Sequence, residues 1–154
     1  MRLLKSPNDW SCLPTSFAMA IGCPVSDFLA HFEHDGSHIQ WPQFSDPKRR
    51  RGFHHQECIL AAWRLGFATT QFELRPRYAP DQYAEPCTVF ERAFSDLVFS
   101  TRGVLTGATH RCGHAVSYDH GQICDCRGKT YGFGHALEND FSPSCVFVLT
   151  PRHQ

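Results

Sequence analysis

The stretch that decides the fold is Asn8-Asp9-Trp10-Ser11-Cys12-Leu13-Pro14-Thr15-Ser16-Phe17. Ser11 is of a residue type that favours helix N-caps, and apolar residues then recur along the chain at helical spacing. Gly22 is a typical helix stop. The pattern therefore predicts a helix over residues 12–21, with the thiol of Cys12 in its opening turn.

Two strand-like stretches near the other end of the chain carry polar residues at their ends. Gly113-His114-Ala115-Val116-Ser117-Tyr118 reads as a strand that begins with a histidine, and residues 121–125 read as the next strand, which ends at Asp125. A turn at 119–121 joins them into an antiparallel hairpin, so the two outer ends lie side by side. We therefore expect His114 and Asp125 to be neighbours, whereas Asp119 sits at the turn, away from the histidine.

The rest of the chain follows an order of helices first and strands afterwards. Further helices are predicted from Ser26 or Asp27 to about 35, over 54–65, and over 88–99, where Thr88 and Glu91 form a capping-box pattern. In the 54–65 helix the core candidates are Ile59, Leu60, Ala62 and Trp63. The further predicted strands are 67–74, 103–108, 128–131 and 145–149, and the loops are 37–52 and 75–86. This order indicates an α+β fold with N-terminal helices packed on a C-terminal antiparallel sheet, in a single domain over residues 1–154.

Composition excludes several classes of partner. The chain has 154 residues, 42% hydrophobic and 19% charged, which is typical of a globular domain. Lys+Arg and Asp+Glu number 15 each, so no net charge favours a nucleic-acid partner. The basic run at 48–51 is interpreted as a solvated loop because no aromatic platform accompanies it. No apolar run approaches the ~20 residues of a membrane span, and no membrane partner is expected.

The eight cysteines bear on the compartment. The segment Met1-Arg2-Leu3-Leu4-Lys5-Ser6-Pro7 lacks the apolar core of a secretion signal. Disulfides are rare in reducing compartments, where buried cysteines behave as small apolar residues. The sequence therefore favours a cytoplasmic protein with most of its thiols free and buried.

Cys12, His114 and Asp125 are the residue types that thiol catalysis requires. The thiolate is the attacking species, and the positive end of a helix dipole stabilises it. An imidazole beside it shuttles the proton, and a carboxylate holds that imidazole in the correct tautomer. The backbone N–H of Cys12 and the side-chain amide of Asn8 are candidate donors to an oxyanion. This set predicts a thiol hydrolase or acyl transferase that requires no cofactor or metal.

These three stretches together resemble the papain-like superfamily of cysteine peptidases. The likeness is greatest to its small bacteriocin-processing-type peptidases of bacteria and phages, and it covers the order of elements over most of the chain. The resemblance implies a papain-like fold, with Cys12 as nucleophile, His114 as base and Asp125 orienting the histidine. It also implies a peptide or protein substrate, in which a peptide or isopeptide bond is cleaved. The oxyanion donor of the family is usually a glutamine about six residues before the cysteine. Ser6 stands there in this chain, and Asn8 is the substitute.

Two other functions use the same residues. A transglutaminase or acyltransferase-like enzyme would share the triad and the first half-reaction, with an amine in place of water. A non-catalytic, cysteine-rich interaction module with zinc is the other alternative. Its potential ligands are His110, Cys112, His114, Cys124 and Cys126, although paired ligands separated by one residue are not the usual zinc spacing.

Overall fold

The computed structural model describes residues 1–37, 52–74 and 88–152. Three helices come first and pack together: α1 (Cys12–Ile21), α2 (Val25–Leu29) and α3 (His55–Arg64). Strand β1 (Phe67–Glu73) and helix α4 (Thr88–Ser100) follow, and the remaining strands complete the chain. The predicted helix over 12–21 is confirmed at both ends, and Gly22 adopts the left-handed conformation, with φ of 90°, that ends it.

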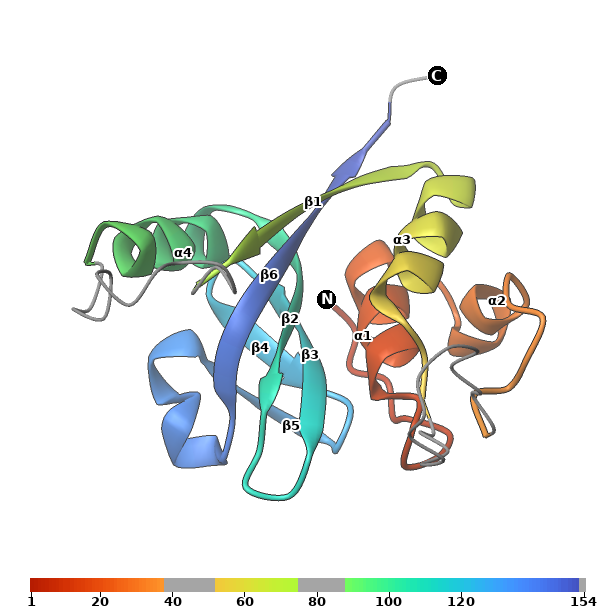
Figure 1. Cartoon of the computed structure of the whole chain (residues 1–154), viewed down its shortest axis with the longest axis horizontal. Coiled ribbons are helices and arrows are strands. Elements are labelled where there is room, and N and C mark those ends of the chain that lie inside the picture. Colours follow the sequence, from red (N-terminus) through yellow and green to blue (C-terminus); the bar gives the residue numbers. More distant parts are fainter. Residues whose placement is uncertain (38–51, 75–87, 153–154) are drawn as a thin grey trace, which may run out of the picture.

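One antiparallel sheet organises the second half of the protein. Its strands are β2 (Arg102–Ala108), β3 (Gly113–Asp119), β4 (Gln122–Asp125), β5 (Lys129–Gly132) and β6 (Ser142–Pro151). They lie in the order β1-β6-β2-β3-β4-β5, so the last strand of the chain inserts between β1 and β2 (Figure 1). The pairing of β6 with β2 is close at Gly103, where an added Cβ would lie 1.9 Å from the carbonyl oxygen of Phe147.

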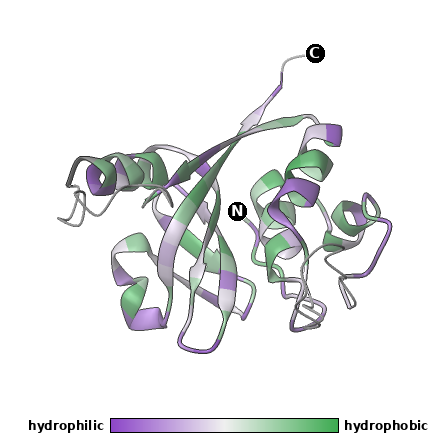
Figure 2. Ribbon diagram, viewed as in Figure 1, coloured by the Kyte–Doolittle hydropathy of each residue, from purple (hydrophilic) through white to green (hydrophobic). Residues whose placement is uncertain are grey.

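Helices cover both faces of the sheet, and successive residues of a strand serve opposite faces. Figure 1 shows α1, α2 and α3 on one side and α4 on the other. On β2 and β6, Val104 and Phe147 pack towards α1, whereas Leu105 and Val146 pack towards α4. Figure 2 shows that α1 is apolar over most of its length, in keeping with its burial, while α4 mixes apolar and polar residues.

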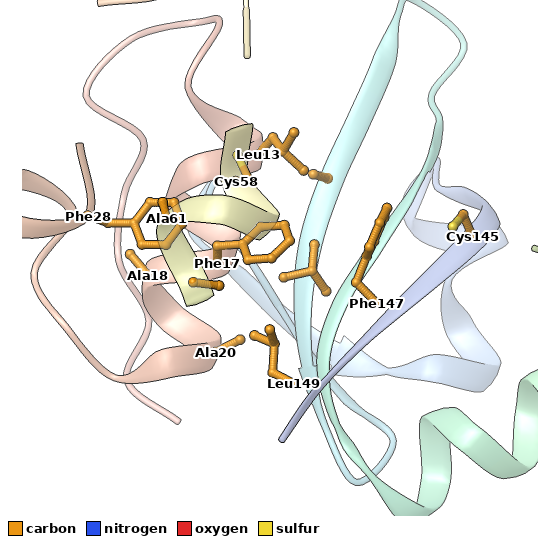
Figure 3. Packing of buried hydrophobic residues seen from close by; sticks show 13 residues of the cluster. Leu13, Phe17, Ala18, Ala20, Phe28, Cys58, Ala61, Cys145, Phe147 and Leu149 are labelled. Carbon is orange, nitrogen blue, oxygen red and sulfur yellow. The ribbon is translucent and has the colours of Figure 1, made fainter. Parts of the chain in front are cut away.

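Phe17 joins the helical layer to the sheet. Its side chain is fully buried and lies against the rings of Phe28 and Phe147, each with a centroid distance of 5.9 Å (Figure 3). Because Phe17 is one turn and a half along α1 from Cys12, this contact also fixes where the N-terminus of the helix meets the sheet.

Replacing Phe17 by alanine is expected to lower the free energy of unfolding by about 3–5 kcal/mol, because a buried ring is lost and the cavity closes only in part. The measurement is urea unfolding followed by circular dichroism. Leu60→Ala is the control, since Leu60 is 49% exposed on α3 and its loss should cost less than about 1 kcal/mol. Equal losses in the two variants would contradict the central place of Phe17 in the core.

Several sequence predictions change in detail. The second helix is shorter than predicted, and β6 extends beyond the predicted 145–149 at both ends. Leu60 and Trp63 are wrong as core residues: α3 buries its stripe of small residues, Cys58, Ala61 and Ala62. Trp63 is half exposed, with the guanidinium of Arg152 3.6 Å above its ring. The basic run at 48–51 and most of the two predicted loops lie outside the described residues. Within those residues, the helices are all too short or too polar to cross a membrane.

Candidate active site

Cys12 is the first residue of α1, at the end of the helix that faces the sheet hairpin. The first intrahelical bond runs from the Thr15 N–H to the Ser11 carbonyl at 3.1 Å, so the N–H of Cys12 belongs to the unpaired first turn of the helix. Ser11 occupies the predicted N-cap position, but its fully buried hydroxyl makes no capping bond. The helix start, and not a side-chain cap, therefore provides the positive partial charge beside the thiol.

His114 and Asp125 meet as the hairpin predicts. His114 is the second residue of β3, Asp125 is the last of β4, and Nε2 of the imidazole lies 3.0 Å from Oδ1 of the carboxylate. Both side chains are buried, Asp125 completely. Asp119 lies at the far end of β3 and bonds Arg102 and His120 instead. Of the two carboxylates considered in the sequence analysis, Asp125 is therefore the partner of His114 and Asp119 is not.

Cys12 hydrogen-bonds the same imidazole. Burial alone would lower the pKa of His114, but its hydrogen bonds with Asp125 and then with Cys12, together with their charges, outweigh burial and raise the pKa to about 9. The imidazole is consequently protonated at neutral pH when a negative sulfur faces it. This is the electrostatic condition for a thiolate–imidazolium pair.

Asp125 has a second partner that the sequence analysis did not identify. The guanidinium of Arg127 donates to Oδ2 from Nε at 2.9 Å and from Nη2 at 2.7 Å, and the backbone N–H of Arg127 donates to Oδ1 at 2.9 Å. Burial opposes ionisation of the carboxyl, yet the bonds with His114 and Arg127 hold the pKa of Asp125 well below its ordinary value. The signal in the sequence was Asp125-Cys126-Arg127-Gly128, a tight turn in which a cation follows the carboxylate by two residues.

Two surface hollows meet at Cys12 and His114. One has charged and polar side chains in its lining, among them Asn8, Arg111, Arg127 and Asp140, and is called the polar hollow below. The other is lined by Trp10, Leu13, Phe53 and by glycines of β2 and β3. Both also contain Asp9 and Cys112.

Asn8 lies in the polar hollow with Cys12. Its side-chain oxygen accepts a hydrogen bond from the N–H of Trp10 at 3.1 Å, and the hydroxyl of Ser6 donates to its backbone carbonyl at 2.6 Å. With the oxygen held by the backbone, the NH₂ of the amide is the end left to donate elsewhere. The indole of Trp10 donates to the carbonyl of Asp35 at 2.9 Å.

A cluster of potential metal donors overlaps the site. One atom each of His114, Asp125 and Cys126 lie within 4.8 Å of one another. His114 and Asp125 already bond to each other, and the carboxylate is also bonded by the cation of Arg127. A metal ion would have to displace this guanidinium, so the cluster suits proton transfer better than metal binding. Of the other predicted ligands, His110 bonds the carboxylate of Asp140 and Cys124 packs against Met19.

Four of the other cysteines in the described part of the chain are buried, whereas Cys12 is only partly buried. Seven described cysteines are free thiols, and Cys58, Cys124, Cys126 and Cys145 are buried. Burial raises the pKa of each of these four, to about 12 for Cys126 and about 11 for Cys145. These thiols therefore stay protonated at neutral pH and are poor nucleophiles.

Comparison with known proteins places the fold. No family model matches the chain, and no curated protein matches its sequence. Among solved structures, the fold is similar to the crystal structure of the peptidase domain of Streptococcus ComA, a bi-functional ABC transporter involved in a quorum sensing pathway. The TM-score is 0.53 at 14% sequence identity, and the match covers 98% of each chain. The predicted α+β, papain-like fold class is thereby confirmed.

Proposed function

We propose that this protein is a cysteine peptidase, or a closely related thiol hydrolase, that cleaves an amide bond in a peptide or protein. One observation carries the proposal: a buried imidazole is hydrogen-bonded on one side to a fully buried carboxylate and on the other to a thiol at a helix N-terminus. The similarity of the fold to a peptidase domain supports it.

In the proposed reaction the sulfur of Cys12 attacks the carbonyl carbon of the substrate. The negative oxygen that forms accepts hydrogen bonds from the N–H of Cys12 and the side-chain amide of Asn8. The imidazolium of His114 then gives its proton to the leaving nitrogen, and the C–N bond breaks to leave a thioester on Cys12. His114 next takes a proton from water, hydroxide displaces the sulfur, and the acid product leaves. Asp125 stays ionised throughout and holds the imidazole in place.

The test that needs no substrate is the rate of alkylation of each cysteine by iodoacetamide between pH 4 and 10, read site by site by mass spectrometry. Because an imidazolium beside the sulfur favours the thiolate, Cys12 should still react at pH 6. There we expect it to be alkylated at least about tenfold faster than the exposed Cys112, since an ordinary thiol is almost wholly protonated at that pH.

His114→Ala is the decisive control in this experiment. Removal of the imidazole should reduce the rate at Cys12 at pH 6 to that of the slower thiols and leave the rate at Cys112 unchanged. Slow alkylation of Cys12 in the unmodified protein, with no effect of His114→Ala, would defeat the proposal. Addition of a primary amine to a substrate reaction then separates hydrolysis from acyl transfer, because an amine acceptor captures the same thioester as an amide.

A further inference from the structure

The turn between β4 and β5 is built around the carboxylate of Asp125. The Gly128 N–H donates to the Asp125 carbonyl at 2.9 Å, and Gly128 adopts a φ of 93° that suits glycine. The chain therefore reverses within four residues, and Arg127 folds back onto the residue that begins the turn.

Arg127 makes most of the bonds that hold Asp125. The carboxylate has four hydrogen bonds in the described structure, and three come from Arg127: its backbone N–H, Nε and Nη2. The fourth comes from His114. The two guanidinium bonds meet the same oxygen, Oδ2, which leaves Oδ1 turned to the imidazole. Paired bonds from the planar guanidinium fix the angle of a carboxylate as well as its charge.

The charge of Arg127 matters because Asp125 is completely buried. A buried carboxyl without a cation favours its neutral form, and a neutral carboxyl would no longer stabilise the imidazolium of His114. Arg127 itself is 38% exposed along its side chain and lines the polar hollow. The arginine thus reaches from the surface of the cleft to the buried carboxylate.

We propose that Arg127 is a positioning residue of the site. It keeps Asp125 ionised and aimed at His114, and so sets the lowest pH at which the Cys12–His114 ion pair persists. This inference rests on the proposed thiol chemistry of Cys12. Other titratable or charged groups also face Asp125 and its partners, from every neighbouring element; they are Cys12 on α1, His114 on β3, Cys126 in the turn, Tyr131 on β5 and Asp140 before β6.

The experiment is the pH dependence of Cys12 alkylation in the full chain, with Arg127→Gln and Arg127→Lys. The acid limb of this profile is the low-pH range in which alkylation of Cys12 slows as the pH falls. Loss of the cation in Arg127→Gln should move this limb to higher pH by about one unit, because a neighbouring arginine lowers the pKa of a carboxyl by at least about that much. Arg127→Lys keeps a charge but cannot make both guanidinium bonds to Oδ2, so its acid limb should lie between those of the unmodified protein and of Arg127→Gln. Arg102→Gln is the matched control, because Arg102 bonds Asp119 on the same sheet, away from the site.

The outcomes separate this inference from the proposed function. The role of Arg127 is overturned if the acid limb of Arg127→Gln coincides with the acid limbs of the unmodified protein and of Arg102→Gln. A fall in the overall rate alone would not support the role, because a purely structural defect lowers the rate at every pH. If Arg127→Gln does not fold, the limb of Arg127→Lys decides: a shift to higher pH supports the role, and an unmoved limb overturns it. If His114→Ala has no effect on Cys12, the proposed function fails instead.

Discussion

Replacement of Cys12 by alanine should abolish cleavage of every substrate that the protein accepts. The expected loss in kcat/KM is at least about 10³-fold, because no other group can form the thioester and only binding and oxyanion donors remain. Alanine is a good helix former at the first position of α1, so the fold should be retained. The measurement is incubation with a library of proteome-derived peptides, with the new amino termini counted by mass spectrometry.

Cys23→Ala provides the matched control for this variant. Cys23 is a partly buried thiol that follows the other end of α1, after the Gly22 stop. Its replacement removes the same sulfur atom just beyond the end of the same helix, away from the site, and cleavage should continue at an unchanged rate. Cleavage that survives in Cys12→Ala and disappears in Cys23→Ala would remove Cys12 from the reaction.

Replacement of Asp125 by asparagine should lower kcat/KM at pH 7 by about 10²–10⁴-fold. The amide carries no charge and can present an N–H to the imidazole, which then turns or takes the wrong tautomer. With the raising contribution of Asp125 gone, the pKa of His114 falls, because burial then opposes only the contribution of Cys12. The imidazolium would then be lost at a lower pH, so the alkaline limb of Cys12 alkylation should move from about pH 9 towards neutrality.

The same change should also reduce stability. The pKa of Asp125 is depressed in the folded protein, so its ionisation stabilises the fold above the ordinary carboxyl pKa of about 4, and this contribution is lost as the pH falls through the lower folded value. Removing the carboxylate leaves Arg127 without its partner at a cost of about 1–3 kcal/mol, reduced by the freedom of the guanidinium to turn into water. Thermal melts of both proteins at pH 7 and at pH 2–3 would measure this loss, since the difference between the two proteins should be smaller in acid.

Asp119→Asn is the control for the second variant. Asp119 is also paired with an arginine on the same sheet, but it lies at the opposite end of β3 from His114. It should retain its activity and its alkylation profile. A larger loss of activity in Asp119→Asn than in Asp125→Asn would reverse the assignment of the orienting carboxylate.

The arrangement of Cys12, His114 and Asp125 could be predicted because each depends on a local pattern. The start of α1 follows from a capping-type residue, helical spacing and a glycine stop, and the neighbourhood of His114 and Asp125 follows from the geometry of a two-stranded hairpin. The packing of α1 against the hairpin, by contrast, joins residues that are far apart in the sequence, so no local pattern predicts it. It was inferred from the order of the elements, and the hydrogen bond of Cys12 to the imidazole required the folded chain.

The contact of Arg127 with Asp125 and the choice of the buried face of α3 were not predicted from the sequence, for different reasons. The reach of the Arg127 side chain depends on the dihedral angles of a turn, which composition does not determine. On α3 the sequence has two apolar stripes, one with Leu60 and Trp63 and one with Cys58 and Ala62. Which of them is buried depends on how closely the helix docks, and the small residues allow the closer approach.

The strand order determines when, during synthesis, the sheet can be completed. Strand β1 is at the edge of the sheet, and its neighbour is β6, the last strand of the chain. During synthesis β1 and the preceding helices emerge from the ribosome long before the strand that will join them to β2. The nucleophile of the proposed reaction is thus made first and the imidazole and carboxylate much later, so the nascent chain carries Cys12 without its two partners until β3 and β4 have been made.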